Sequence, residues 1–196
     1  NEIIIISAFI KLSGINWLVE NIGSKNIKCQ IMGRFSASDL VNGSSDLDIY
    51  KILSEKNWEL KFLNNLHAKI ILIDKSLLFI GSPNLTGKGM KLAPVSNIEM
   101  GVKTLAQDNE ILMVNSLYEE GVLVDQNLYE EINKWLKNQN RTESQKIEFP
   151  IKILEQLTPN YKIWVYDFPW LSIEELIEKD SSSVEFMHDI ELYDLN

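Results

Sequence analysis

One stretch of the chain, residues 66–86, carries polar residue types at a spacing that could serve chemistry on an anion. It reads LHAKIILIDKSLLFIGSPNLT, with the pattern H-x-K-x4-D-x6-G-S-x-N at His67, Lys69, Asp74, Gly81, Ser82 and Asn84. A histidine can act as a nucleophile or carry a proton near neutral pH. Side chains two apart on a strand point to the same face, which places Lys69 beside His67. Ser82 and Asn84 have the same spacing on the next segment, so the four side chains could converge on a phosphate.

The elements that must position these residues alternate between strand and helix patterns. The predicted strands cover residues 2–9, 27–32, 58–63, 67–73, 76–80 and 98–103, and the predicted helices cover residues 13–22, 45–56, 107–120 and 126–138. Ser45 is the expected N-cap of the second helix. The two strands of the motif form a predicted hairpin that closes at Asp74-Lys75. Strand–helix units mixed with a hairpin predict an α/β fold, with a mixed β-sheet sandwiched between helices.

Length and composition fit one globular domain with a small appendage. The 196 residues are 45% apolar and include five tryptophans, enough for a sizeable core. The single cysteine, Cys29, excludes an internal disulfide and a cysteine zinc cluster, which fits a cytoplasmic location. No apolar run approaches the roughly eighteen residues that span a bilayer, so no membrane partner is expected.

The net charge of −9 is unevenly distributed along the chain. Residues 1–100 hold eleven Lys and Arg against nine Asp and Glu, a balance of +2, whereas residues 101–196 hold eight against nineteen, a balance of −11. The half that contains the motif is therefore mildly basic, and a cleft there could attract phosphates. The acidic half fits an ordinary solvated surface.

A polar segment near residues 138–144, NQNRTES, indicates a boundary. We expect a catalytic domain over residues 1–140 and, over residues 141–196, a short acidic C-terminal extension or the start of a further domain. Its aromatic residues, Trp164, Tyr166, Phe168 and Trp170, could stack on bases. Core packing is the favoured use of such a cluster.

The motif resembles the HKD signature of the phospholipase D superfamily at every position. Residues 2–100 resemble members of this superfamily more loosely. Members include lipid-modifying enzymes, small endonucleases and the nuclease domains of some restriction enzymes. The resemblance implies a phospholipase D-like fold. It also implies cleavage or transfer of phosphodiesters through a covalent phosphohistidine, with neither metal nor cofactor.

The resemblance assigns roles to the motif residues. His67 would attack phosphorus, while Lys69 and Asn84 would hold the non-bridging phosphate oxygens. Ser82 would bind the same oxygens or orient Lys69. Asp74 and Gly81 would be structural, as a turn residue and a point of close backbone approach respectively.

A second imidazole must protonate the leaving oxygen and later activate water. The other histidine of the chain, His188, lies in the acidic tail with no motif around it. Members of the superfamily with a single motif bring two copies together across a two-fold axis. We therefore expect a homodimer that shares its active site.

Two further segments resemble nuclease members of the superfamily. Asn97-Ile-Glu99 resembles an N-x-E segment whose carboxylate accepts a hydrogen bond from Nδ1 of the nucleophilic histidine, so Glu99 is expected to hold His67. The segment from Arg34 to Asp46 resembles a stretch found in domains associated with restriction enzymes and helicases. Arg34, directly after a strand, would contact a DNA phosphate.

Three functions fit these observations. The first is a metal-independent phosphodiesterase acting on DNA, such as the endonuclease domain of a restriction or phage-defence protein. The second is a phospholipase D or phosphatidyltransferase acting on phospholipid head groups. The third is a DNA-binding or dimerisation module without catalytic activity, against which the intact set of motif residues argues.

Overall fold

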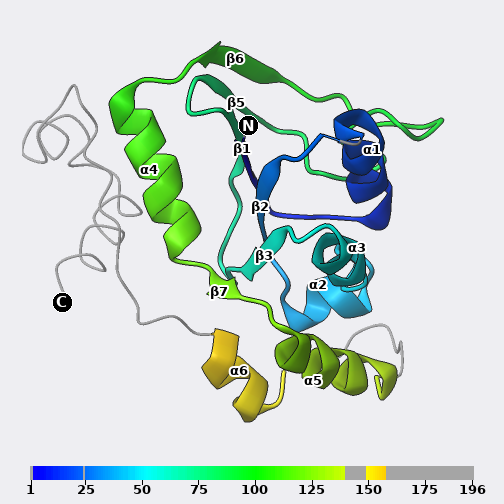
Figure 1. Ribbon diagram of the computed structural model, residues 1–196. Coiled ribbons are helices and arrows are strands. Elements are labelled where there is room, and N and C mark those ends of the chain that lie inside the picture. Colours follow the sequence, from blue (N-terminus) through cyan, green and yellow to red (C-terminus); the bar gives the residue numbers. More distant parts are fainter. Residues whose placement is uncertain (1, 24, 140–148, 158–196) are drawn as a thin grey trace, which may run out of the picture. The chain divides into compact units, whose positions relative to one another are not determined.

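The computed structural model describes residues 2–23, 25–139 and 149–157 (Figure 1). The strands are β1 (Glu2–Ser7), β2 (Lys28–Gly33), β3 (Glu59–Phe62), β4 (Lys69–Ile73), β5 (Leu77–Gly81), β6 (Gly101–Leu105) and β7 (Val122–Leu123). The helices are α1 (Leu12–Ile22), α2 (Ala37–Val41), α3 (Ile49–Glu55), α4 (Asp108–Glu119), α5 (Gln126–Lys137) and α6 (Ile151–Leu157). The hairpin, most strands and the longer helices lie where the sequence predicts them.

The seven strands of the described residues form one mixed sheet in the order β6-β5-β4-β1-β2-β3-β7. Strands β1, β2 and β3 are parallel, as two strand–helix units require. Strand β4 returns antiparallel to β1, and β5 and β6 continue antiparallel beyond it. The predicted mixed α/β sheet is confirmed.

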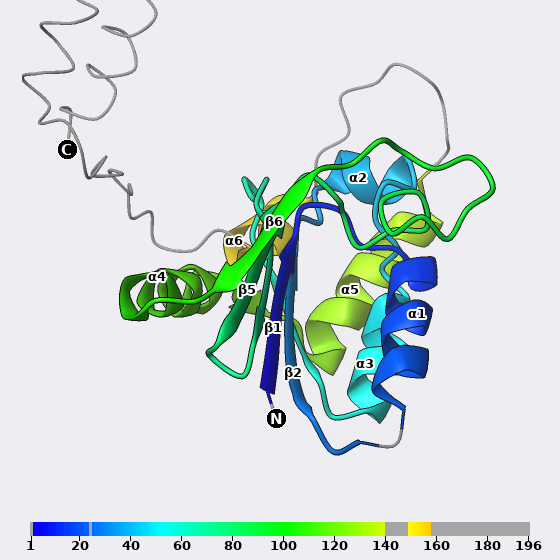
Figure 2. The same cartoon turned by 90° about the horizontal axis from the view of Figure 1, so that it is seen from above.

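Helices cover both faces of this sheet (Figure 2). Helices α1, α3 and α5 pack on one face around a core that includes Ile31, Phe35 and Leu53. Helix α4 packs on the other face, where Val114 and Tyr118 meet apolar residues of β1 and β4. The predicted sandwich of helix, sheet and helix is thus formed.

The strand register brings the predicted site together at one end of the sheet. Ser7, the last residue of β1, pairs with Gly33 at the end of β2 and with Lys69 at the start of β4. The segments that leave β1 and β2 therefore meet the segment that enters β4. Strand β5, antiparallel to β4, also ends here, at Gly81. We call this end of the sheet the site edge.

The structure corrects the prediction for the segment between β2 and β3. Ser45 does not cap the second helix, because that helix begins at Ile49 and its N-cap is Asp48. The Ser45 hydroxyl donates instead to the Arg34 carbonyl at 3.1 Å. A short helix that was not predicted, α2, precedes α3, and Ser36 and Asp39 form its capping box.

Strands at the two borders of the sheet also differ from the prediction. The strand expected over residues 98–103 is β6, shifted to Gly101–Leu105, because pairing with β5 begins at Gly81 and Gly101. The two-residue strand β7 was not predicted, since two residues show no periodicity. It pairs with β3 and closes the other border of the sheet.

Part of the predicted extension packs against α5. The Phe149 and Trp135 rings meet edge to face at 4.6 Å, and Lys152 Nζ lies 2.6 Å from Glu131 Oε1. Trp164, Tyr166, Phe168, Trp170 and His188 lie outside the described residues. The division at residue 140 therefore stays a prediction. None of the described helices has both the length and the apolar character needed to cross a bilayer.

We expect Ser7→Ala to lower the free energy of unfolding by about 1–3 kcal/mol. Ser7 is 2% exposed, and its hydroxyl donates to the Phe9 carbonyl and accepts from the Leu85 N–H. Alanine would leave the buried Leu85 N–H and the partly buried Phe9 carbonyl without this partner. Urea unfolding at one fixed protein concentration measures the change.

Ser54→Ala, at an exposed position of α3, is the matched control and should change stability by less than about 0.5 kcal/mol. Equal effects of the two substitutions would show that the Ser7 hydroxyl contributes nothing of its own.

Candidate functional site

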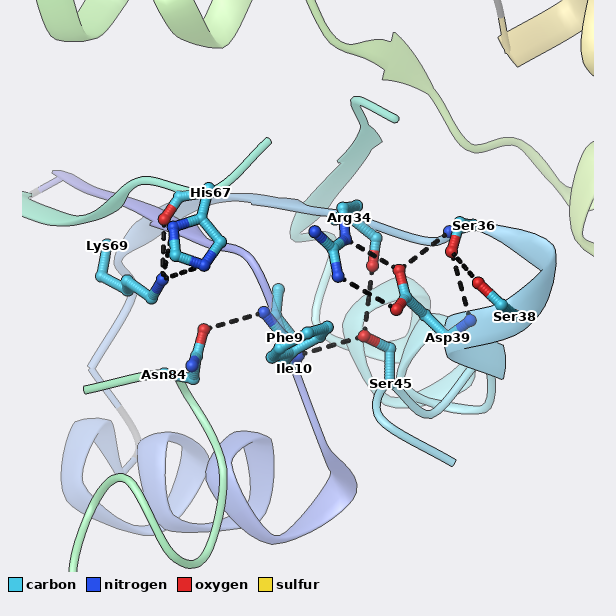
Figure 3. Close-up of polar contacts among 10 residues, drawn as sticks. All are labelled: Phe9, Ile10, Arg34, Ser36, Ser38, Asp39, Ser45, His67, Lys69 and Asn84. Atoms are coloured by element: carbon cyan, nitrogen blue, oxygen red, sulfur yellow. Dashed lines mark hydrogen bonds and ion pairs between the residues drawn. The ribbon is translucent and has the colours of Figure 1, made fainter. Parts of the chain in front are cut away.

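His67 and Lys69 lie side by side at the site edge (Figure 3). Lys69 Nζ donates to the His67 carbonyl oxygen at 2.7 Å and lies 3.3 Å from both nitrogens of the imidazole ring. The two equal distances show that the ammonium group is not aligned with either ring nitrogen. The ring is exposed, so a substrate can approach it. The pair predicted from the i, i+2 spacing is formed.

The Lys69 ammonium group lies in a partly buried and positively charged environment. Burial lowers the pKa of Lys69, and the nearby charge of Arg34 lowers this pKa further, while Glu99 acts in the opposite direction. The attraction of an anion bound beside Lys69 would offset both effects. The electrostatics therefore favour an anionic ligand.

Asn84 is held so that its amide nitrogen stays available. Its Oδ1 accepts a hydrogen bond of 3.0 Å from the Phe9 backbone N–H. Because the side-chain oxygen faces Phe9, the NH2 group of Asn84 is the end left to donate. Figure 3 shows Asn84 on the same side of the site as Lys69 and His67. We call His67, Lys69 and Asn84 the reactive cluster.

Ser82 and Glu99 form a separate pair beside the reactive cluster. The Ser82 hydroxyl donates to Glu99 Oε2 and accepts from the Met100 N–H at 3.0 Å. Glu99 Oε1 accepts from Asn97 Nδ2 at 2.9 Å. The predicted hydrogen bond from His67 Nδ1 to Glu99 is not made in this structure, in which the Glu99 carboxylate accepts from Ser82 and Asn97 instead.

Asp74 and Gly81 occupy the structural positions that the motif suggests. Asp74 lies at the hairpin turn with φ of 51°, and its Oδ1 accepts from the Glu2 N–H at 2.9 Å, which ties the turn to the start of β1. This turn is at the end of β4 away from Lys69. At Gly81 a Cβ atom would lie 2.7 Å from the Met100 carbonyl oxygen, so a larger residue would push β6 away.

Arg34 lies near the reactive cluster, fixed by partners that sequence reasoning did not identify. Its Nε and Nη2 donate to the two carboxylate oxygens of Asp39 at 2.8 and 3.1 Å. Its guanidinium carbon lies 4.7 Å from the centre of the Phe9 ring. The spacing Ser36-x-x-Asp39 is typical of a capping box, so this capping box could have been predicted. Phe9 gives no such signal, because it lies in an apolar run that predicts only a strand.

An apolar groove of about 460 Å³ opens next to Lys69 and Glu99. It lies against β4, β5 and β6 on the sheet face opposite α4, where Ile71, Leu77 and Phe79 line it. Met100, which lines it, is one of several exposed apolar side chains of residues 92–105, and the others are Leu92, Val95, Ile98, Val102 and Leu105. Val102 pairs with Ile80 and projects from the face that α4 covers. Contiguous apolar exposure of this extent is uncommon on the surface of a monomeric protein.

The acidic, cysteine and histidine side chains of the described residues do not gather in threes at any point where they could hold a metal ion. The donors brought to the site edge are instead cationic or amide N–H groups. Such donors suit the non-bridging oxygens of a phosphate.

The fold and the reactive cluster together agree with one family. The family model described as "Cardiolipin synthase, PLD-like domain" matches residues 1–120, more than half of the chain. The chain therefore belongs to the phospholipase D superfamily, whose HKD signature it carries at His67, Lys69 and Asp74.

Several solved structures are similar to the chain. NucT from Helicobacter pylori is 22% identical with a TM-score of 0.46, and the match covers 60% of this chain and 76% of that one. Nuc, a phospholipase D family member from Salmonella typhimurium, is 15% identical with a TM-score of 0.49, over 64% and 83%. Phosphatidylserine synthase from Haemophilus influenzae is 10% identical with a TM-score of 0.48, over 70% and 37%. No curated protein matches the chain.

We expect Ser82→Ala to raise the pKa of Glu99. Hydrogen bonds from Ser82 and then Asn97 are the main causes that hold this pKa below its ordinary value. A carboxyl group whose pKa is lowered on folding stabilises the fold above its unfolded pKa. It loses that contribution as the pH falls through the folded value. A carbon-13 NMR titration of the glutamate carboxyl groups measures the shift.

Asn97→Ala should raise the pKa of Glu99 by a smaller amount, because Asn97 is the second cause. A pKa of Glu99 that is unchanged in Ser82→Ala would contradict the assignment of Ser82 as its main partner.

Proposed function

We propose that this protein is a metal-independent phosphodiesterase that hydrolyses DNA through a covalent phosphohistidine. The observation that carries the proposal is the reactive cluster: an exposed imidazole, with the Lys69 ammonium 3.3 Å from its ring nitrogens and the Asn84 amide beside it. A nucleophile and two donors for the phosphate oxygens thus face one space.

The reaction would proceed in two displacements at phosphorus. In the first, a ring nitrogen of neutral His67 attacks, the N–P bond forms, and the bond to the leaving oxygen breaks. A second imidazole, in its protonated form, gives its proton to that oxygen. In the second step the same imidazole takes a proton from water, whose oxygen attacks phosphorus and releases His67. The products are an alcohol and a phosphate monoester.

Lys69 and Asn84 would stabilise the charge that develops on the non-bridging oxygens. Lys69 brings a positive charge that burial and Arg34 already disfavour without an anion. Asn84 donates from a side chain whose orientation is fixed by the Phe9 N–H. Donors held in place before the reaction need no reorganisation during it. Glu99, held by Ser82, contributes a negative charge that partly offsets the lowering of the Lys69 pKa.

DNA is the proposed substrate because Arg34 extends the cationic surface beyond the reactive cluster. Its charge is close enough to lower the pKa of Lys69. A single phosphodiester needs no second cation outside the cluster, whereas a nucleic acid strand carries further phosphates. The resemblance of the Arg34–Asp46 segment to restriction-associated domains supports a cytoplasmic endonuclease of a restriction or phage-defence system.

The second imidazole is proposed to come from a second copy of the chain. Among the described residues, His67 is the only histidine. The apolar groove continues directly from Lys69 and Glu99, and Ile98 and Met100 flank Glu99 with exposed fractions of 103% and 82%. A two-fold contact over this surface would bury the exposed side chains and place two reactive clusters together.

A phosphatidyltransferase or phospholipase D is the second candidate function. The same exposed apolar side chains of residues 92–105 could contact acyl chains instead of a partner subunit. The chemistry at phosphorus would be unchanged, with a lipid head-group alcohol as the leaving group. The third alternative, a module that only binds DNA or dimerises, would leave the cluster unused.

We expect the protein to nick supercoiled plasmid DNA in EDTA, and His67→Ala to lower the rate by at least about 10³-fold, as for other catalytic nucleophiles. His188→Ala, the matched control, should keep the wild-type rate. Gel electrophoresis of the plasmid measures nicking, and acid-labile labelling of the protein by a phosphorus-32 substrate detects the phosphohistidine.

Cleavage that needs Mg²⁺, or that survives His67→Ala, would contradict the mechanism. Release of head groups from phospholipid vesicles without nicking would favour the lipid enzyme. Absence of both activities would favour the binding module.

We expect the active protein to sediment as a dimer. Ile98→Asp should weaken the dimer and reduce nicking together, because the substituted carboxylate would have to be desolvated in the contact. Ile151→Asp is the control, since Ile151 is also strongly exposed, at 74%, but lies on α6. Sedimentation velocity with parallel activity assays measures both effects. An active protein that stays monomeric at all concentrations would rule out the shared site.

A further inference from the structure

Phe9 is the exception in a run of buried residues. Ala8 and Ile10 on either side of it are 0% exposed, whereas the Phe9 side chain stays partly exposed at the site edge. Its N–H donates to Asn84 at 3.0 Å and its carbonyl accepts from the Ser7 hydroxyl at 2.8 Å. The backbone of Phe9 is therefore fixed to the reactive cluster and to β1 at once.

Arg34 stacks on this ring and is fixed from its other side. The guanidinium carbon lies 4.7 Å from the ring centre, a cation–π distance. Asp39, whose side chain is 9% exposed, holds Nε and Nη2 in a bidentate pair. The Arg34 backbone is also tied down, by the Ala8 carbonyl at 3.1 Å and the Ser45 hydroxyl at 3.1 Å.

These contacts leave part of the guanidinium free to donate. A guanidinium has five N–H groups, and the pair with Asp39 uses one on Nε and one on Nη2. Within the described residues, the Nη1 group has no hydrogen-bond partner, and the Arg34 side chain is 26% exposed. A protein that needed only an internal ion pair could have buried this group.

The order of groups along the site edge is donor, apolar ring, donor. Figure 3 shows Phe9 between Asn84, which belongs to the reactive cluster, and Arg34. A nucleic acid strand has the same alternation, because an apolar sugar ring links each phosphate to the next. Arg34 is also set apart from the phosphate that Lys69 and Asn84 would hold.

We propose that Phe9 and Arg34 form a subsite for the nucleotide next to the cleaved bond, in which Arg34 binds the neighbouring phosphate and the Phe9 ring contacts the sugar between the two phosphates. Asp39 is the positioning residue of this subsite. The inference rests on the proposed DNA substrate and adds a requirement for a second charged phosphate on the same strand.

The experiment uses oligonucleotides in which one phosphate is replaced by an uncharged methylphosphonate. End-labelled DNA, single- or double-stranded as the wild type cleaves it, reports the rate of cleavage at each bond separately. For the wild type, a methylphosphonate on one defined side of a cleaved bond should lower kcat/KM at that bond by about tenfold or more, because a charge-assisted hydrogen bond is lost.

Arg34→Met removes the side chain proposed to bind that phosphate. In this variant the methylphosphonate should therefore lower kcat/KM by less than about twofold. Lys28→Met is the matched control, since exposed Lys28 begins the strand that Arg34 follows, and it should keep the full tenfold effect. Asp39→Asn should reduce the effect partly and act mainly on KM. In Arg34→Met the salt dependence of DNA binding should also fall, by about one unit of slope.

A wild type whose cleavage tolerates a methylphosphonate on either side of the bond overturns the subsite without any variant. The same conclusion follows if the full effect persists in Arg34→Met, which has no donor for that phosphate. Plasmid nicking in EDTA that depends on His67 would still stand in both cases, so failure of the subsite is distinguishable from failure of the proposed function.

Discussion

The pairing of β1 with a parallel neighbour on one side and an antiparallel neighbour on the other is the constraint on which the site depends. The parallel partner β2 ends level with β1, at Gly33 opposite Ser7, while the antiparallel partner β4 begins there, at Lys69. At this end of the sheet the chain therefore leaves β1 and β2 and enters β4. A slip of one residue between β1 and β4 would turn Lys69 to the opposite face, so the apolar packing of both faces also fixes the chemistry.

Asn84 and Arg34 have one feature in common. Neighbouring residues bind one end of each side chain and leave the other end free. Asn84 gives its oxygen to the Phe9 N–H and keeps its NH2 group, and Arg34 gives one edge of its guanidinium to Asp39 and keeps Nη1. Side chains fixed in this way have already lost the rotamer freedom that binding would otherwise cost. Preorganised donors of this kind are what catalysis of phosphoryl transfer requires of a protein.

The spacing of the motif made the proximity of His67, Lys69 and Asn84 predictable, because the hairpin between His67 and Asn84 is local in sequence. Lys69 begins β4 and His67 lies just before this strand, so their contact depends on neighbouring residues alone. The partners of these residues were harder to predict. Phe9 and Asp39 act through contacts that depend on where β1 and α2 lie in space. The resemblance placed Glu99 at the site, but only the structure shows Ser82 and Asn97 as its hydrogen-bond partners.

Helices cover one half of the sheet better than the other, and this difference bears on function. Strands β1, β2 and β3 are packed between helices, whereas β5 and β6 present an apolar groove and β6 is exposed along its whole length. An exposed apolar border strand is an aggregation hazard unless another surface covers it. The groove also reaches Lys69 and Glu99, so whatever covers it must come to the reactive cluster. In the proposed homodimer, a second copy of the chain would cover this surface and supply the second imidazole through the same contact, so one proposal accounts for both the single histidine of the site and the uncovered part of the sheet.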